Sequence, residues 1–312
     1  MTSLADVSPE EAGRYPGAAA PARTRRVDAH GVGIAVHEWG DEDAPPLLIT
    51  HGGADFARTF DVFAPLLAAG GWRVVAWDHR GHGDSDHAAL YSWDADLRDA
   101  FAVLRSTTDR PVPVLGHSKG GALLMGLAEA VPHRVKALVN LDGLPSRRKL
   151  PDVANRERVR LLAGDLEDWL DRRRAAAQAD RRPGTIAELA ARRARMNPRH
   201  DLRWLRYLVT VGARRYRDGW RWKLDPIIRG GGFGPWRPDW ALWRMSSLPQ
   251  PFFGVIGLVP EVMTSGNRPE EVREHLPRGG RLLVLDDVGH FVHIEQPDRI
   301  AAEVLDFLGP PS

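Results

Sequence analysis

The segment Gly116 to Gly120, which reads G-H-S-K-G, constrains the fold of this chain more than any other. It follows a short apolar run, Pro113 to Leu115, and precedes a segment with helical patterning. Glycines on both sides of a serine permit the sharp strand-to-helix turn that lifts the serine hydroxyl above the edge of a sheet. The pattern therefore predicts a strand–turn–helix unit with Ser118 as a candidate nucleophile, although G-x-S-x-G alone also occurs by chance.

A serine hydroxyl is a weak nucleophile and needs a histidine to take its proton, with a carboxylate to orient that histidine. Of the 12 histidines, His290 has the most telling context. It follows an apolar run suited to a strand, Arg281 to Leu285, and precedes an amphipathic segment from Pro297 to Leu308 that predicts a final helix. His290 is thus the candidate base, and the nearby His293 is interpreted as a structural histidine.

Two further blocks accompany these segments. Leu47 to Gly53 is an apolar run ending in His-Gly-Gly, and Asp78 to Ser85 has the pattern D-x-R-G-x-G-x-S. Together with the serine turn and the stretch from Gly289 to Pro297, they resemble the α/β-hydrolase superfamily. The resemblance covers nearly everything except the first two dozen residues and the middle hundred. It implies the α/β-hydrolase fold, with a mostly parallel, doubly wound eight-stranded sheet and an inserted helical cap.

The hydrophobic patterning agrees with that fold. An antiparallel ribbon is expected at the start, and helices are expected to separate buried strands. The expected strands are Arg25 to Ala29, Ile34 to Trp39, Pro46 to Thr50, Trp72 to Trp77, Pro113 to Leu115, Ala137 to Leu141, Phe252 to Gly257 and Arg281 to Leu285, with helices over Phe60 to Ala69, Asp94 to Arg105 and Gly120 to Ala130. Because proline cannot donate to a ladder, Pro113 predicts that its strand starts late.

The resemblance also implies a set of site residues. Ser118 and His290 are carried over as nucleophile and base, and Glu261 is preferred as the acid because it follows the next-to-last expected strand. Asp142, which follows the preceding strand, remains the alternative acid. The amides of Gly53 and Lys119 are nominated for the oxyanion hole. The Lys119 side chain is expected to pair with an acid rather than to meet a substrate carboxylate.

A serine at the turn argues against epoxide opening and halide displacement, because relatives with those activities use an aspartate there. Acyl transfer to water remains, and the expected reaction is hydrolysis of a carboxylic ester, thioester or lactone through an acyl-enzyme. No cofactor and no metal are expected. A cofactor-free acyltransferase or perhydrolase with the same triad, and a non-catalytic ligand-binding protein on this scaffold, stay open as alternatives.

The expected domain organisation is a flexible lead over residues 1–24, an α/β core over 25–143 and 248–312, and a helical cap over 144–247. The cap is rich in arginine and tryptophan, which suits a hydrophobic or aromatic acyl substrate. For any single tryptophan, packing of cap onto core is the favoured interpretation. The candidates for the pocket wall are Trp204, Trp220, Trp222, Phe233, Trp236, Trp240 and Trp243.

Composition narrows the function class. The formal net charge of +2 is too small to favour nucleic-acid binding, even though arginines gather in the cap. No stretch has the length and apolarity of a membrane span, and residues 1–24 do not resemble a secretion signal. With 0 cysteines, disulfides are excluded and a cytoplasmic enzyme is the simplest expectation. The sequence predicts neither the oligomeric state nor the identity of the substrate.

Overall fold

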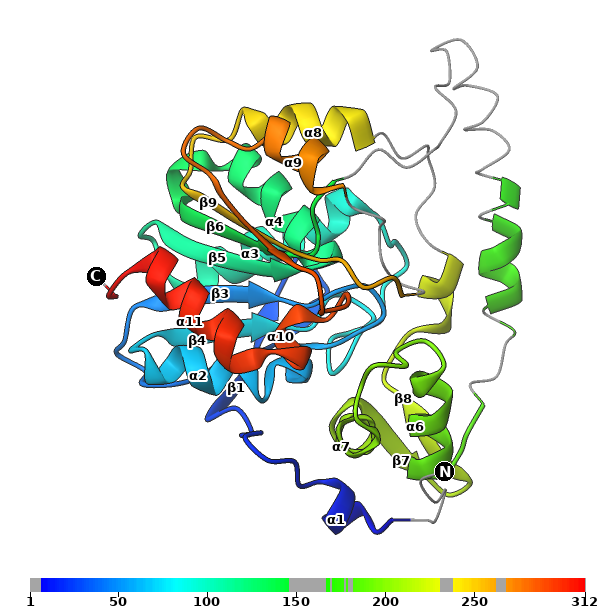
Figure 1. Ribbon diagram of the computed structural model, residues 1–312. Helices are drawn as coiled ribbons and strands as arrows, with labels where there is room; N and C mark the ends of the chain where they lie inside the picture. Colours follow the sequence, from blue (N-terminus) through cyan, green and yellow to red (C-terminus); the bar gives the residue numbers. More distant parts are fainter. Residues whose placement is uncertain are drawn as a thin grey trace.

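One eight-stranded sheet runs through the centre of the molecule (Figure 1). The structure is a computed structural model that describes residues 7–145, 167–168, 170–176, 178, 182–230, 238–261 and 268–311. The strands are β1 (Arg23–Asp28), β2 (Gly33–Trp39), β3 (Pro46–Thr50), β4 (Arg73–Trp77), β5 (Val112–His117), β6 (Val135–Leu141), β9 (Phe252–Gly257) and β10 (Arg281–Leu285). The expected α/β-hydrolase sheet is confirmed.

The strand order is β1-β2-β4-β3-β5-β6-β9-β10. Strand β2 pairs antiparallel with β1 and β4, and every other neighbouring pair in this sheet is parallel. The carboxyl ends of β3, β5, β6, β9 and β10 therefore meet at one edge, where ligand sites of open α/β sheets form. All the predicted site residues follow one of these five strands.

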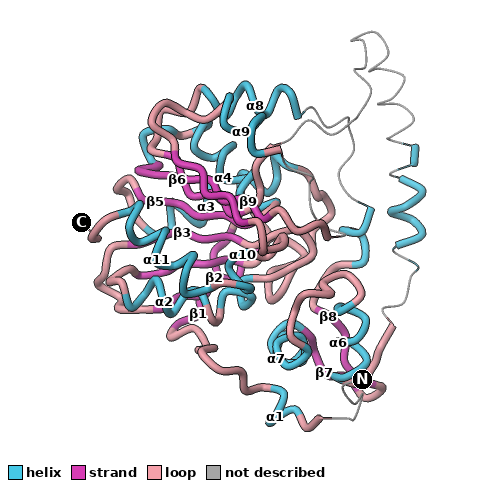
Figure 2. Tube along the Cα trace, viewed as in Figure 1, coloured by secondary structure: helices cyan, strands magenta, loops and turns pink. Residues whose placement is uncertain are grey.

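Helices cover both faces of the sheet (Figures 1 and 2). Successive strand residues alternate between two cores, as the pleat of a strand requires. Val114 of β5 packs with one helix layer, for example, and Leu115 packs with the other. The first layer contains α3 (Trp93–Thr107), α4 (Lys119–Ala130), α8 (Pro238–Ser246) and α9 (Pro269–Glu274); the second contains η1 (Ala57–Phe60), α2 (Phe63–Ala69), α10 (Val292–Glu295) and α11 (Pro297–Leu308).

Strand β5 begins earlier than the prolines suggest. It starts at Val112, and its register against β6 shifts between Val112 and Pro113. Pairing with β3 begins only at Val114. The missing donor of Pro113 therefore falls at an irregular position at the beginning of the strand, where it removes little of the ladder.

The described part of residues 144–247, the segment predicted as a cap and called the cap below, forms a small layer of its own. It consists of α6 (Ile186–Ala194), α7 (Leu202–Gly212), the hairpin β7 (Ala213–Tyr216) and β8 (Gly219–Trp222), and η3 (Pro226–Gly230). Residues 7–22, which include α1 (Pro9–Ala12), pack against it: the Tyr15 ring lies 4.9 Å from that of Trp204. The segment predicted as a flexible lead thus has contacts with the cap.

The tryptophans of the cap do not share one role. Trp204 is buried and stacks on Tyr207 at 5.3 Å, whereas Trp243 is 61% exposed. Trp222 contacts Phe56 of the core at 6.4 Å between ring centroids. Phe233, Trp236 and the Trp240 side chain lie outside the described residues.

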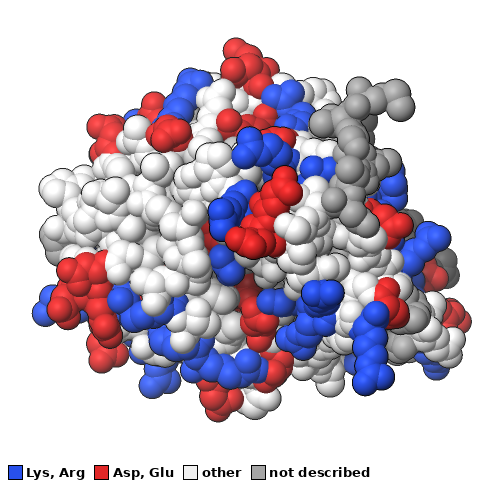
Figure 3. All heavy atoms as spheres, turned by 90° about the horizontal axis from the view of Figure 1, so that it is seen from below, with Lys and Arg blue, Asp and Glu red and all other residues white. Residues whose placement is uncertain are grey.

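Acidic and basic side chains lie intermixed on the face shown in Figure 3, in keeping with the low formal net charge of +2. Within the described ranges, none of the helices combines the length and apolarity needed to cross a bilayer.

Candidate active site

Ser118 occupies the turn between β5 and α4 in a conformation that the flanking glycines make possible. Its backbone has φ 51° and ψ −119°, a strained region for a residue with a side chain. A Cβ atom on Gly116 would lie 2.3 Å from the Gly120 carbonyl carbon, and one on Gly120 would lie 2.5 Å from the Thr50 oxygen. Both glycines are therefore needed for close backbone approach, as the sequence pattern indicated.

The ring of His290 lies between Ser118 and Asp142. Its Nε2 atom is 2.9 Å from the Ser118 Oγ, and its Nδ1 atom is 2.6 Å from the Asp142 Oδ2. Both the His290 and Asp142 side chains are 2% exposed. Asp142 accepts the Nδ1–H, which leaves the Nε2 lone pair facing the serine hydroxyl; this is the arrangement that activates a serine nucleophile.

The turn after β6 fixes the Asp142 carboxylate. Asp142 adopts φ 52°, and the Gly143 amide donates to the Asn140 side chain at 2.8 Å. The second carboxylate oxygen, Oδ1, accepts a hydrogen bond from the Gly257 amide at 3.1 Å. Because β6 lies between β5 and β9 in the sheet, a side chain after β6 is held next to Ser118 and also reaches the loop after β9.

Glu261 is hydrogen-bonded to the main chain of His290, whereas Asp142 is hydrogen-bonded to its ring. Its Oε2 atom accepts a hydrogen bond from the His290 backbone amide at 2.8 Å. Both ring nitrogens of His290 are already engaged, Nδ1 by Asp142 and Nε2 by Ser118. The geometry therefore contradicts the prediction that Glu261, and not Asp142, orients the His290 ring. The loop after β9 brings the Glu261 carboxylate to the main chain of His290.

The loop after β3 lies beside the serine turn. A Cβ atom on Gly52 would lie 3.2 Å from the Ser118 Cβ, and one on Gly53 would lie 4.0 Å from the Lys119 Cβ. Within the described part of the chain, no protein acceptor is hydrogen-bonded to the amide of Gly53 or Lys119. Both amides are thus available near the serine, as an oxyanion hole requires.

The Lys119 side chain pairs with an acid. Its Nζ atom lies 2.6 Å from the Asp96 Oδ2 in α3, and the two side chains are 27% and 7% exposed. The pairing was expected, but its partner was not, because nothing in the sequence around Asp96 distinguishes it from other helical acids. The ion pair anchors the first turn of α4 to α3 next to the nucleophile.

Six histidines around the site share deep burial, which favours their neutral form. His51 lies in the loop after β3, for instance, where its Nε2 accepts a hydrogen bond from the His79 amide at 3.0 Å. Burial lowers the pKa to about 3 for His51, His200 and His293, to about 4 for His82, and well below the usual value for His79 and His117.

These histidines predict a loss of stability on mild acidification. In the unfolded chain they bind protons as the pH falls through about 6.5, whereas in the folded protein they stay neutral, so acid favours unfolding by about 1.4 kcal/mol per histidine per pH unit. The midpoint of thermal unfolding is expected to be level above pH 7 and to fall steeply between pH 6.5 and 5. An equal midpoint at pH 7.5 and pH 5, followed by circular dichroism, would contradict this.

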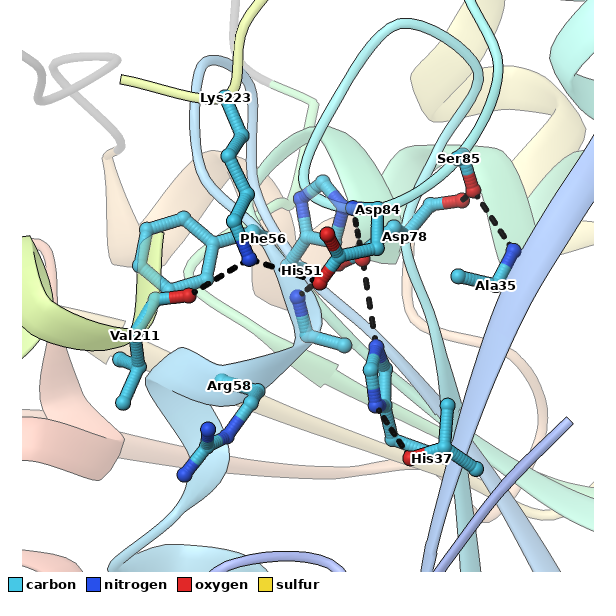
Figure 4. Close-up of polar contacts among 12 residues, drawn as sticks. Ala35, His37, His51, Phe56, Arg58, Asp78, Asp84, Ser85, Val211 and Lys223 are labelled. Atoms are coloured by element: carbon cyan, nitrogen blue, oxygen red, sulfur yellow. Dashed lines mark hydrogen bonds and ion pairs between the residues drawn. The ribbon is translucent and has the colours of Figure 1, made fainter. Parts of the chain in front are cut away.

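A polar cluster lies where the cap meets the turn after β4, with His37 and Asp78 buried and Asp84 partly exposed (Figure 4). Possible ligand atoms of His37, Asp78 and Asp84 lie within 4.8 Å of one another. Asp78 accepts from the Ala57 and Asp84 amides at 2.7 and 2.8 Å and lies 3.3 Å from the His37 Nε2. The Lys223 Nζ donates to the Asp84 Oδ2 at 2.8 Å. Backbone amides thus donate to the Asp78 carboxylate, and the Lys223 ammonium pairs with that of Asp84.

Lys223 links the cap to the core, and we therefore expect it to contribute measurably to the stability of the fold. Besides its ion pair, it donates to the Val211 carbonyl oxygen at 3.2 Å, and its side chain is 17% exposed. Lys223→Met keeps most of the side-chain volume and is expected to lower the free energy of unfolding by about 1 kcal/mol. Chemical denaturation measures this, with Arg217→Met, an exposed cap residue, as control. Equal values for the two variants would argue against the link.

The fold and a comparison with known families define the class of the protein. The family model for the alpha/beta hydrolase fold matches residues 45–297. The chain belongs to this family, and it is a hydrolase.

Individual relatives agree with the class. The chain is 30% identical over 290 residues to Lipase LipV of Mycobacterium tuberculosis, with 89% of this chain and 99% of the lipase covered. It is 25% identical over 276 residues to an sn-1-specific diacylglycerol lipase of Mus musculus, covering 86% and 82%. Among solved structures, the thioesterase domain from the curacin biosynthetic pathway is similar in fold, with a TM-score of 0.77, 24% identity and coverage of 91% and 99%.

Proposed function

We propose that this protein is a serine hydrolase that cleaves a carboxylic ester or thioester of a small hydrophobic molecule, with Ser118, His290 and Asp142 as its triad. The observation that carries the proposal is the pair of contacts made by the His290 ring, 2.9 Å to Ser118 and 2.6 Å to Asp142. The lipase relatives support a hydrophobic ester as substrate. A cytoplasmic location, inferred from the absence of cysteine, belongs to the same proposal.

The proposed reaction has two halves. In acylation, the Ser118 Oγ attacks the carbonyl carbon, its proton passes to the His290 Nε2, and the amides of Gly53 and Lys119 stabilise the oxyanion. The tetrahedral intermediate collapses when the leaving alcohol or thiol takes the proton from the Nε2. In deacylation, a water molecule gives a proton to the His290 Nε2 and attacks the acyl carbon. The second tetrahedral intermediate collapses when the Ser118 Oγ leaves and takes that proton back, which releases the carboxylic acid and restores the serine.

The cap residues beside the loop after β3, which carries Gly53, support an apolar acyl group. Phe56 follows that loop, and Trp222 approaches it from the cap at 6.4 Å. The charge of the neighbouring Asp55 is matched by Arg193, whose Nη2 lies 2.9 Å from the Asp55 Oδ1 and whose guanidinium lies 5.3 Å from the Trp222 ring centroid. Phe56 and Trp222 thus provide aromatic surface, and the Asp55–Arg193 ion pair beside them leaves no net charge for an apolar acyl group to meet.

A series of p-nitrophenyl esters tests the proposal. The acetate, butyrate, octanoate and benzoate are each mixed with the purified protein, and nitrophenol release is followed from the first milliseconds. A burst stoichiometric with enzyme, followed by a slower steady state, is the expected sign of an acyl-enzyme that deacylates. Product transfer to an added alcohol or to peroxide instead of water favours the acyltransferase or perhydrolase. No release with any ester, from a folded protein, favours the ligand-binding alternative.

A further inference from the structure

The loop that carries His290 is held by two carboxylates on successive amides. Glu261 accepts from the His290 amide at 2.8 Å, and Glu295 accepts from the Gly289 amide at 3.0 Å. A Cβ atom on Gly289 would lie 2.5 Å from the Glu261 Oε2 and 2.8 Å from the Glu295 Oε1. The two acids therefore converge on one short stretch of backbone, where a side chain at Gly289 would displace them.

Two carboxylates that share such a small region repel each other unless a positive charge is close. Arg199, from the cap segment between α6 and α7, supplies that charge. Its Nε and Nη2 atoms lie 2.8 and 2.6 Å from the Glu295 Oε2, and its Nη2 also donates to the Asp287 carbonyl oxygen at 2.7 Å. The hydrogen bond to Glu295, followed by the charges of Glu295, Glu261 and Asp287, raises the pKa of Arg199.

The next cap residue extends the contact. The ring of His200 packs edge-on against that of Phe291, with 4.6 Å between the centroids. Phe291 directly follows the candidate base and lies 5.2 Å from the His290 ring. Residues 199 and 200 of the cap thus contact the histidine loop on both sides of His290.

We propose that Arg199 is a positioning residue through which the cap sets the place of His290. Arg199 acts through Glu295 and the Asp287 carbonyl, which fix the backbone of the loop, and it does not touch the reacting atoms. The inference rests on the proposed function in one respect: a precisely placed His290 matters for the rate only if it is the base.

The expected signature is a rate loss out of proportion to the stability loss. The Arg199 side chain is 34% exposed, and ion pairs with that exposure contribute little to folding. Displacement of a catalytic group by about 1 Å, in contrast, can lower a rate by about 100-fold. Arg199→Ala is therefore expected to unfold within a few degrees of the wild type, and to lower kcat about 10-fold or more with KM changed less than about 3-fold.

The first test is independent of catalysis. Hydrogen exchange of a peptide spanning residues 286–296 is measured for the wild type, Arg199→Ala and Arg195→Ala. Arg195 is an exposed arginine four residues earlier that forms no ion pair within the described ranges. Exchange at Gly289 and His290 is expected to rise about 10-fold in Arg199→Ala alone. Equal exchange in all three proteins would overturn the inference.

The second test asks whether Arg199 acts through Glu295. Glu295→Gln keeps an oxygen for the Gly289 amide and removes the charge that pairs with Arg199. In this background, adding Arg199→Ala is expected to cost much less in kcat than in the wild type, whereas Arg199→Lys alone is expected to recover part of the rate. Fully multiplicative effects of Arg199→Ala and Glu295→Gln would overturn the coupling. A wild type that cleaves no ester would overturn the proposed function. The hydrogen-exchange result would still show whether Arg199 holds the loop that carries His290.

Discussion

A Ser118→Ala variant is expected to lose about 10⁶-fold in kcat toward a p-nitrophenyl ester, close to the limit set by water and background binding. The reason is geometric. The Ser118 Oγ faces the His290 Nε2 at 2.9 Å from a strained turn that holds it above the sheet edge. Alanine removes the nucleophile but leaves that turn, so the fold is expected to survive.

His290→Ala should cost about as much, and the double variant Ser118→Ala with His290→Ala little more than either single one, because the two groups act as a unit. Steady-state kinetics with matched thermal unfolding curves measures this. Ser246→Ala, an exposed serine at the end of α8, serves as control and should leave kcat unchanged. Activity in Ser118→Ala within 100-fold of the wild type would rule out Ser118 as the nucleophile.

Asp142→Asn is expected to lower kcat about 10⁴-fold, whereas Glu261→Gln should lower it less than about 10-fold. Asparagine keeps the shape of Asp142, but it places an amide where the His290 Nδ1 now has an acceptor at 2.6 Å, so the ring loses both its counter-charge and its productive tautomer. Glutamine at position 261 still offers an oxygen to the His290 amide. The contrast between the two variants distinguishes the carboxylate that contacts the His290 ring from the one that contacts its backbone amide.

The same ester assay, with both proteins checked for an unchanged circular dichroism spectrum, gives the comparison. The control for Asp142→Asn is built in, since Glu261→Gln also removes one negative charge from the surroundings of His290. The reverse order of effects would return Glu261 to the place that the sequence suggested for it.

The strand pattern and the serine turn were predictable because they depend on local sequence. Apolar runs between glycines and helical segments predicted the strands at Pro46, Phe252 and Arg281 with the bounds that the structure has. Strand β5 was less predictable, since the effect of Pro113 depends on where its neighbours begin to pair. The register shift against β6 accommodates it.

Spacing along the chain could not show whether Glu261 or Asp142 contacts the ring of His290. Glu261 and Asp142 both follow strands that end at the same sheet edge. Which of them reaches the His290 ring depends on the order of those strands across the sheet. Strand β6 is the direct neighbour of β5, whereas β9 is one strand further away. A carboxylate immediately after β6 therefore meets the ring, and one that is four residues past the end of β9 meets the loop behind it.

The cap contacts were beyond prediction for a different reason. Arg199 and Glu295 are separated by 96 residues, and Lys223 and Asp84 by 139, so no local pattern connects them. Arg192 and Arg193, in the last turn of α6, show the same effect. Arg193 pairs with Asp55 in the loop after β3, and Arg192 donates to the carbonyl oxygens of Arg182 and Pro183.

Labelling with a fluorophosphonate probe, with the modified residue located by mass spectrometry, identifies the side chain that is activated as a nucleophile. We expect one adduct, on Ser118, that forms rapidly in the wild type and in Glu261→Gln and at least about 100-fold more slowly in Asp142→Asn and His290→Ala. An adduct on another residue, or rapid labelling of Asp142→Asn, would contradict a nucleophile activated by His290 and Asp142.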